Sequence, residues 1–180
     1  MIEKLVVISD MWGAKKGLWI ASYFGYLQQY YDIVFHDSQQ LGGIDVPLGT
    51  DENVRKAFLE GGIETAVAQL LRKEPRPAHY LAFGIGGSIG YKAALAGLSM
   101  KSLTAISAVD IAGEQQRPDM PLHLIFGQQD AQRPSAQWAQ KVGVEMELAP
   151  HFGHGLYTDE KIISEICLGL LETVTQKKEV

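Results

Sequence analysis

The sequence of 180 residues has almost no cysteine, no excess of basic charge and no long hydrophobic run. Its one cysteine, Cys167, excludes an internal disulfide and leaves no cysteine cluster for a metal such as zinc. The formal net charge is −5, so the chain lacks the excess of basic residues that neutralises nucleic-acid phosphates. We therefore expect no nucleic-acid partner. The apolar run at residues 5–8 is too short for a signal sequence or a membrane span. We therefore expect a cytoplasmic protein without a membrane partner.

Hydrophobic residues, in contrast, make up 46% of the sequence, and its length fits about one domain. Short apolar runs alternate with longer amphipathic segments, which is typical of a parallel sheet covered by helices. We predict strands at residues 5–8, 32–36, 79–83, 103–109, 122–126 and 145–148. We predict helices at residues 16–30, 51–73 (with a break at Gly61–Gly62), 89–98, 134–142 and 159–175. The predicted fold class is α/β, with a single domain (1–180) built on a three-layer, doubly wound, mostly parallel sheet of about six strands.

Three segments at the ends of predicted strands contain residue types that carry chemistry. In doubly wound sheets, ligands bind in the loops at the carboxyl ends of the strands. Residues 84–90 (GIGGSIG) follow the third strand, Gly127-x-x-Asp130 follows the fifth, and Gly153–His154 follows the sixth. A sharp strand-to-helix turn needs glycine because side chains would collide there. Each motif is weak evidence alone, but their order along the chain is informative.

That order resembles the arrangement of the α/β-hydrolase superfamily, and the resemblance covers nearly the whole chain. It implies that Asp130 is the acid of a catalytic triad and that His154 is the general base. It also implies an oxyanion pocket formed by Met11 and Trp12, after the first strand, and by Ile85, after the third. The implied activity is hydrolysis of esters or similar acyl substrates, with no cofactor and no metal.

The sequence departs from the family in two places outside residues 84–90. Where the family's oxyanion loop usually begins with His-Gly, this chain has Ser9–Asp10. Residues 110–121, where family members often insert cap helices, show no helical period. We therefore expect a small member without a cap domain.

Two registers of residues 84–90 compete for the nucleophile position. In the first, Gly86-x-Ser88-x-Gly90 makes Ser88 the nucleophile. In the second, Gly84 stands where the serine should be, and the following glycine pair lets the helix pack closely on the strand. We favour the second, because the first would place Gly84 and Gly86 inside a strand, which weakens a strand. The registers exclude each other, since Ser88 would lie about 6 Å along the helix from Gly84, and a general base reaches only about 3 Å.

The two registers predict different functions. With Gly84 in the nucleophile position, the protein forms no acyl-enzyme and binds a small ligand, or moves a proton with His154 and Asp130. With Ser88 as nucleophile, it is an active serine esterase in which His154 is the base and Asp130 orients that base. Either would take a small-molecule ligand or ester substrate. The exposed edge strands of so small a sheet are compatible with a homodimer.

Other interpretations of these residues stay open. Asp130 could instead cap a turn, and His154 could be an ordinary loop residue. Asp110, at the end of the fourth strand, is a second candidate for the acid. Gly84-x-Gly86 followed by Asp110 is similar in spacing to a dinucleotide-binding motif, but it lacks the third glycine and follows the wrong strand. Nucleotide binding is therefore the remote alternative.

The remaining histidines and Cys167 have simpler expected roles. His36 ends its strand near the same edge of the sheet and could line a pocket. We expect His79 and His123 to be packing residues within strands, and His151 to face solvent. Cys167 lies among apolar residues of the last helix, so we expect it to be buried and inert.

Overall fold

Six parallel strands form a single sheet in the order β2-β1-β3-β4-β5-β6. The structure is a computed structural model that describes residues 1–176. The strands are β1 (Glu3–Ile8), β2 (Tyr31–His36), β3 (Ala78–Phe83), β4 (Met100–Ile106), β5 (Leu122–Gly127) and β6 (Met146–Ala149). The predicted α/β fold with a six-stranded parallel sheet is confirmed.

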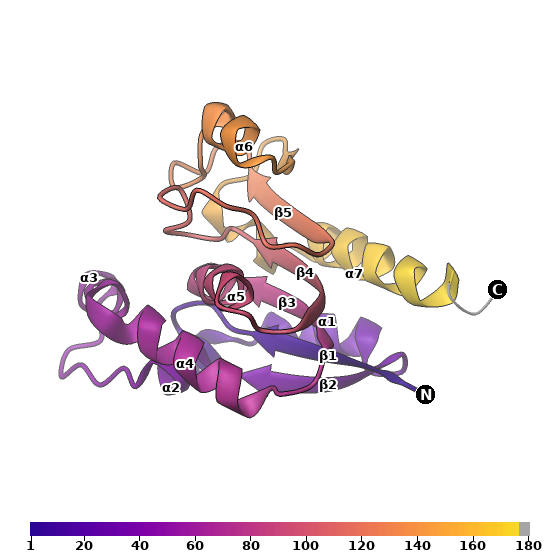
Figure 1. Cartoon of the computed structure of the whole chain (residues 1–180), viewed down its shortest axis with the longest axis horizontal. Coiled ribbons are helices and arrows are strands. Elements are labelled where there is room, and N and C mark those ends of the chain that lie inside the picture. The colour runs from indigo at the N-terminus through magenta and orange to yellow at the C-terminus, as the bar shows by residue number, and fades with distance from the viewer. Residues whose placement is uncertain (177–180) are drawn as a thin grey trace.

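Helices cover both faces of the sheet (Figure 1). The α-helices are α1 (Ile20–Leu27), α2 (Ser38–Gly42), α3 (Asp51–Ala57), α4 (Ile63–Lys73), α5 (Ile85–Leu95), α6 (Ala136–Val142) and α7 (Glu160–Thr175). Shorter turns are η1 (Gly13–Lys16), the π-helical η2 (Phe58–Gly62) and η3 (His154–Thr158). Helices α2 to α6 pack on one face, and α1 and α7 pack on the other. No helix within residues 1–176 is long and apolar enough to cross a membrane.

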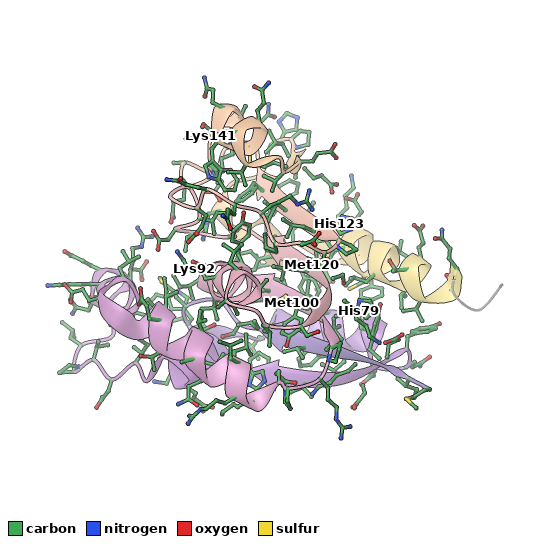
Figure 2. All side chains as sticks on the ribbon, in the orientation of Figure 1. His79, Lys92, Met100, Met120, His123 and Lys141 are labelled. Carbon is green, nitrogen blue, oxygen red and sulfur yellow. The ribbon has the colours of Figure 1, made fainter. Side chains whose placement is uncertain are left out.

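The core is divided by the sheet into two apolar clusters. The central strand β3 is buried along all six of its residues, because helices cover it on both sides. On the α5 face, Met100 and Met120 are partly buried against the larger cluster (Figure 2). On the α1 and α7 face, Cys167 is 0% exposed, and burial raises the pKa of its thiol to about 12. The prediction that Cys167 is buried is confirmed, and its raised pKa fits an inert thiol.

The predicted helix at 16–30 is wrong in its first third. The chain forms η1 over Gly13–Lys16, and α1 begins only at Ile20. The cause is Asp37, whose carboxylate lies against Gly13 (φ +64°) and accepts the N–H of Ala14 at 2.8 Å. Asp37 also accepts the N–H groups of Gln39 and Gln40, which caps α2, a helix that the sequence did not predict.

The other boundaries shift for local reasons. Strand β4 ends at Ile106, short of the predicted residue 109, because Ser107 has a φ of +54° and cannot continue the strand. Helix α5 begins at Ile85, four residues before the predicted start at 89. The predicted break at Gly61–Gly62 is confirmed, since Gly61 has a φ of +136° within η2.

The strand order places a topological switch point beside β1. The chain leaves β1 for β2 on one side and then crosses to β3 on the other. Loops that diverge in this way leave a crevice at the carboxyl ends of the two strands. The residues at these two ends are Asp10, after β1, and Gly84, after β3.

Candidate functional site

A single residue, Gly84, makes the turn between β3 and α5. Its φ of +55° and ψ of −121° lie where a residue with a side chain is strained by about 1–3 kcal/mol. Its N–H donates to the carbonyl oxygen of Ile106 at 2.9 Å, and its own carbonyl oxygen accepts the N–H of Gly87 at 3.0 Å. A Cβ atom at Gly84 would make ordinary contacts, the nearest with Cβ of Asp10 at 3.4 Å. The turn therefore has room for a small side chain, but its backbone dihedral angles favour glycine.

The next two glycines bring α5 close to the sheet. A Cβ atom at Gly86 would overlap the backbone oxygen of Ser9, and one at Gly87 would lie 2.8 Å from Cβ of Ala108. Both contacts involve atoms that cannot easily move. This is the packing role that the second register assigns to the glycine pair.

Ser88 points into the core from the first turn of α5. It is 0% exposed, and its Oγ atom forms no hydrogen bond with any residue that the structure describes. A working nucleophile needs a hydrogen bond to its base. The structure therefore does not bring Ser88 into hydrogen-bond contact with His154.

Asp130 and His154, in contrast, come together at the carboxyl edge of the sheet. Nδ1 of His154 lies 2.9 Å from Oδ2 of Asp130. Asp130 is buried, whereas about a third of the His154 side chain (35%) is exposed. Asp130 Oδ1 also accepts the N–H of Gln132 at 2.9 Å, so this carboxylate both stabilises its turn and contacts the imidazole. The contact favours a proton on Nδ1 and leaves the Nε2 lone pair for a ligand.

Two further residues fix the loop that carries His154. Ser107, which directly follows β4, donates its hydroxyl to the backbone oxygen of His154 at 2.6 Å. Gly127, at the end of β5, has no side chain to collide with the backbone of Phe152 and Gly153. Sequence reasoning missed Ser107, because a serine after a strand carries no signal of a contact with a loop 47 residues later.

The predicted oxyanion residues lie at the carboxyl ends of two neighbouring strands, β1 and β3. Met11 and Trp12 belong to the loop after β1, and Ile85 is the first residue of α5. The Met11 backbone oxygen accepts a hydrogen bond from the Gln39 side chain at 2.8 Å, and Lys16 Nζ lies 3.8 Å from the centre of the Trp12 ring. The first N–H groups of a helix have no partner within the helix, so Ile85 offers a backbone donor beside Gly84.

A buried Asp10 carboxyl lies at the same strand ends, and the sequence indicated Asp10 only as a departure from the family's oxyanion loop. Its Oδ2 accepts the Tyr157 hydroxyl at 2.9 Å, and its Oδ1 accepts the N–H of Trp12 at 3.1 Å. Burial raises the pKa of Asp10, and the nearby Asp37 carboxylate adds to this. The two hydrogen bonds and the His154 imidazole oppose the rise only in part. Tyr157 stands three residues after His154 on η3, a spacing that could have suggested the contact.

The raised pKa of Asp10 predicts that the free energies of unfolding of wild type and Asp10→Asn differ by an amount that depends on pH. A carboxyl whose folded pKa exceeds its unfolded value stabilises the fold fully below about pH 4, and this contribution is lost as pH rises through the folded pKa. The free energy of unfolding of Asp10→Asn should therefore improve relative to wild type above about pH 4, by about 1.4 kcal/mol for each pH unit until the folded pKa is reached. Urea unfolding across this range measures it. A difference that is independent of pH would contradict the burial of a titrating carboxyl.

The other candidate residues lie outside this cluster. Asp110 Oδ2 lies 3.8 Å from Nζ of Lys92 on α5 (Figure 2), whereas His154 is paired with Asp130. His36, at the end of β2, has its Nε2 2.8 Å from Oε1 of Glu74. No group of three or more possible metal ligands occurs within residues 1–176.

The strand histidines differ from each other. His79 is buried, as predicted, with Nδ1 2.7 Å from Oγ of Ser102. His123 is exposed, so the prediction of a packing role is wrong for it. His123 lines a groove between β5 and α7. His151 is exposed, as predicted, and also lines this groove.

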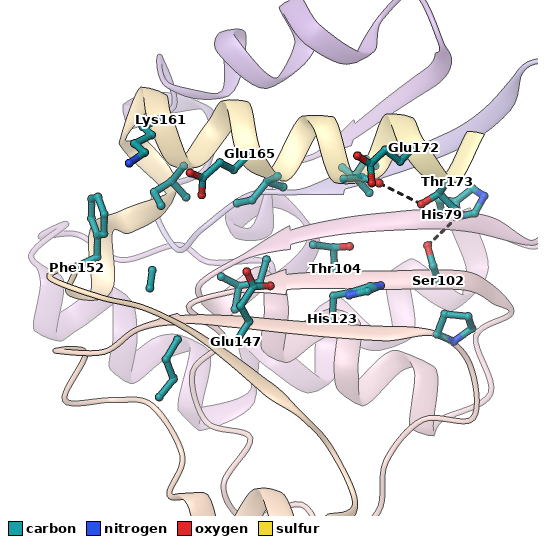
Figure 3. Close-up of a pocket in the computed structure, with 18 of the residues that line it drawn as sticks. His79, Ser102, Thr104, His123, Glu147, Phe152, Lys161, Glu165, Glu172 and Thr173 are labelled. Carbon is teal, nitrogen blue, oxygen red and sulfur yellow. Dashed lines mark hydrogen bonds between the residues drawn. The ribbon is translucent and has the colours of Figure 1, made fainter. Parts of the chain in front are cut away.

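That groove is a cavity of about 1100 Å³ between α7 and strands β4, β5 and β6 (Figure 3). Figure 3 shows His123 and Thr104 on its floor, with Glu165 and Lys161 on the helical wall. Gly84, Asp130 and His154 do not line it. The groove is therefore separate from the candidate site at the strand ends.

Comparison with known proteins shows the fold of the chain. No family model matches the chain, and no curated protein matches it. Among solved structures, a protein of Xanthomonas campestris pv. campestris described as a hydrolase of the alpha/beta superfamily aligns with a TM-score of 0.69 at 16% identity, over 95% of this chain and 99% of the other. Est1E from Butyrivibrio proteoclasticus aligns with a TM-score of 0.66 at 12% identity, over 97% of this chain and 89% of the other.

A third solved structure also has an α/β-hydrolase description. MGS-MChE2, an alpha/beta hydrolase enzyme from the metagenome of sediments from the lagoon of Mar Chica, Morocco, aligns with a TM-score of 0.64 at 13% identity. The alignment covers 98% of this chain and 92% of that one. Together with the parallel sheet and the order of the turn, acid and histidine along the chain, these matches show that the chain has the α/β-hydrolase fold.

Proposed function

We propose that this protein works without an acyl-enzyme, with Gly84 in the position of the nucleophile and His154, oriented by Asp130, as a general base for a bound small molecule. The conformation of Gly84 carries the proposal. Its φ of +55° and ψ of −121° make the sharp strand-to-helix turn at the end of β3, the place where a nucleophile is presented in this fold. A glycine there has no atom that could attack an acyl group.

The placement of Ser88 supports the same conclusion. A serine that is fully buried and has no hydrogen-bond partner in the described chain cannot pass its proton to His154. The Asp130–His154 contact, however, is kept at 2.9 Å, with the imidazole partly exposed. A base that is oriented by a buried carboxylate but has no nucleophile is suited to removing a proton from a ligand or from water.

The proposal predicts that an alkyl fluorophosphonate does not label the wild-type protein. Such probes react with a serine that a neighbouring histidine activates, and Ser88 lacks that contact. Labelling is measured by intact-protein mass spectrometry, with a serine esterase as the positive control. Ser88→Ala is the matched variant: labelling of wild type that disappears in Ser88→Ala would make Ser88 the nucleophile and overturn the proposal.

A further inference from the structure

Asp10 and Tyr157 meet beside the position that a nucleophile would occupy. A Cβ atom at Gly84 would lie 3.4 Å from Cβ of Asp10 and 4.0 Å from the Tyr157 hydroxyl. The hydroxyl and Asp10 Oδ2 are joined by a hydrogen bond of 2.9 Å. Asp10, whose Cβ atom is the nearest to this position, belongs to the loop where the resemblance places the oxyanion-binding backbone.

This pair is held in place by packing. The Tyr23 hydroxyl donates to the backbone oxygen of Tyr157 at 2.8 Å. The rings of Trp19 and Phe83 lie 4.8 and 5.5 Å from the Tyr157 ring, centre to centre. Tyr157 also shares η3 with His154, and their ring centres are 6.3 Å apart. The His154 base and Tyr157, which binds Asp10, are therefore held by the same short helix.

Within residues 1–176, Asp10 has no cationic side chain as an ion-pair partner. None of the ion pairs formed in this range includes it, although only 6% of the residue is exposed. The titratable groups that face it are Tyr157, His154 and Asp37. A buried carboxyl without a cation favours its neutral, protonated form, and a protonated carboxyl is a proton donor.

We propose that Asp10 is the proton donor of this site, acting opposite the His154 base on a neutral small molecule that has a C–H group next to a carbonyl, an inference that rests on the function proposed above. The carbonyl oxygen would lie between Asp10 and the N–H of Ile85, at the start of α5, where donors stabilise developing negative charge. A neutral substrate fits because the Asp37 and Asp130 carboxylates lie near Asp10 and His154 and would repel an anion.

The proton transfers balance without a co-reactant. His154 Nε2 removes the proton from the carbon next to the carbonyl, and the C–H electron pair becomes a carbon–carbon double bond. The electron pair of the carbonyl π bond moves to the oxygen, and this oxygen takes the proton of Asp10. The product is the enol. The Tyr157 hydroxyl then stabilises the Asp10 carboxylate through its hydrogen bond. His154 returns its proton to water and Asp10 takes one from water, so the net reaction is keto–enol tautomerisation.

Deuterium exchange tests this inference. The purified protein is incubated in deuterium oxide with two neutral ketones, phenylacetone and acetoin, and loss of the α-proton signal is followed by NMR. We expect exchange above the buffer rate with wild type, a fall of about 100-fold or more in His154→Gln, and a fall of about 100-fold in Asp10→Asn. Asp119→Asn, in an exposed loop, is the matched control and should exchange at the wild-type rate. Thermal unfolding of each variant shows that it is folded.

Each outcome decides a different point. No exchange above buffer with either ketone overturns the assignment of carbonyl substrates. Exchange that falls in His154→Gln but is unchanged in Asp10→Asn overturns Asp10 as the donor and leaves the proposed function standing. Fluorophosphonate labelling of wild type at Ser88, in contrast, is the failure of the proposed function itself.

Discussion

Replacement of Gly84 by serine is expected to turn a protein that fluorophosphonates do not label into one that they label at least about 100-fold faster than wild type. The introduced hydroxyl would stand at the end of β3, in a turn whose backbone already presents that position. A Cβ atom fits there with no contact shorter than 3.4 Å. The Asp130–His154 contact supplies the base. Mass spectrometry of the labelled protein measures the gain and identifies the modified residue.

The control for this experiment is Gly84→Ala. It has the same backbone strain, which should lower the stability of both variants by about 1–3 kcal/mol, but it has no hydroxyl and should not be labelled. Adding His154→Gln to Gly84→Ser should abolish the gain, because the hydroxyl then has no base. If folded Gly84→Ser is not labelled, Gly84 does not occupy the nucleophile position relative to His154.

The fold could be predicted from sequence because its signals are local. Alternating apolar and amphipathic segments predict all six strands, and the segment at 79–83, apolar except for His79, is the buried centre of the sheet. The errors occur where a distant residue decides the local structure. Helix α1 starts late because Asp37, on another element, binds the N–H of Ala14. No periodicity within residues 16–30 contains that information.

The candidate site was only partly predictable, for a related reason. Asp130 and His154 each follow a strand, and parallel strands bring their carboxyl ends to one edge, so their proximity followed from topology. Asp10 was visible only as a departure from the family's loop, because its partner Tyr157 lies 147 residues away. Asp10 is buried without a cationic partner in the described part of the chain, and this follows from the assembled fold and not from any sequence motif.

Gly127→Ala is the substitution that we expect to damage both the fold and the site. A Cβ atom at Gly127 would overlap the backbone oxygens of Phe152 and Gly153, which belong to the loop just before His154. That loop cannot simply move away, because the Phe152 oxygen accepts the N–H of Gln129 at 2.9 Å. Overpacking against backbone should cost about 3 kcal/mol. For a chain of this size that is about 6–12 °C in Tm, measured by thermal unfolding.

The matched control, Gly169→Ala, separates this clash from any general effect of the change. Gly169 lies inside α7 with nothing within 4 Å of a new Cβ atom, so alanine there should stabilise the protein by about 1 kcal/mol through helix propensity. A wild-type Tm for Gly127→Ala would mean that the loop at 152–153 can relax and that glycine is not needed there. If Tm falls as expected, the result explains why glycine stands at the start of Gly127-x-x-Asp130. Without a side chain at Gly127, the loop before His154 passes close to the end of β5, and His154 can reach Asp130.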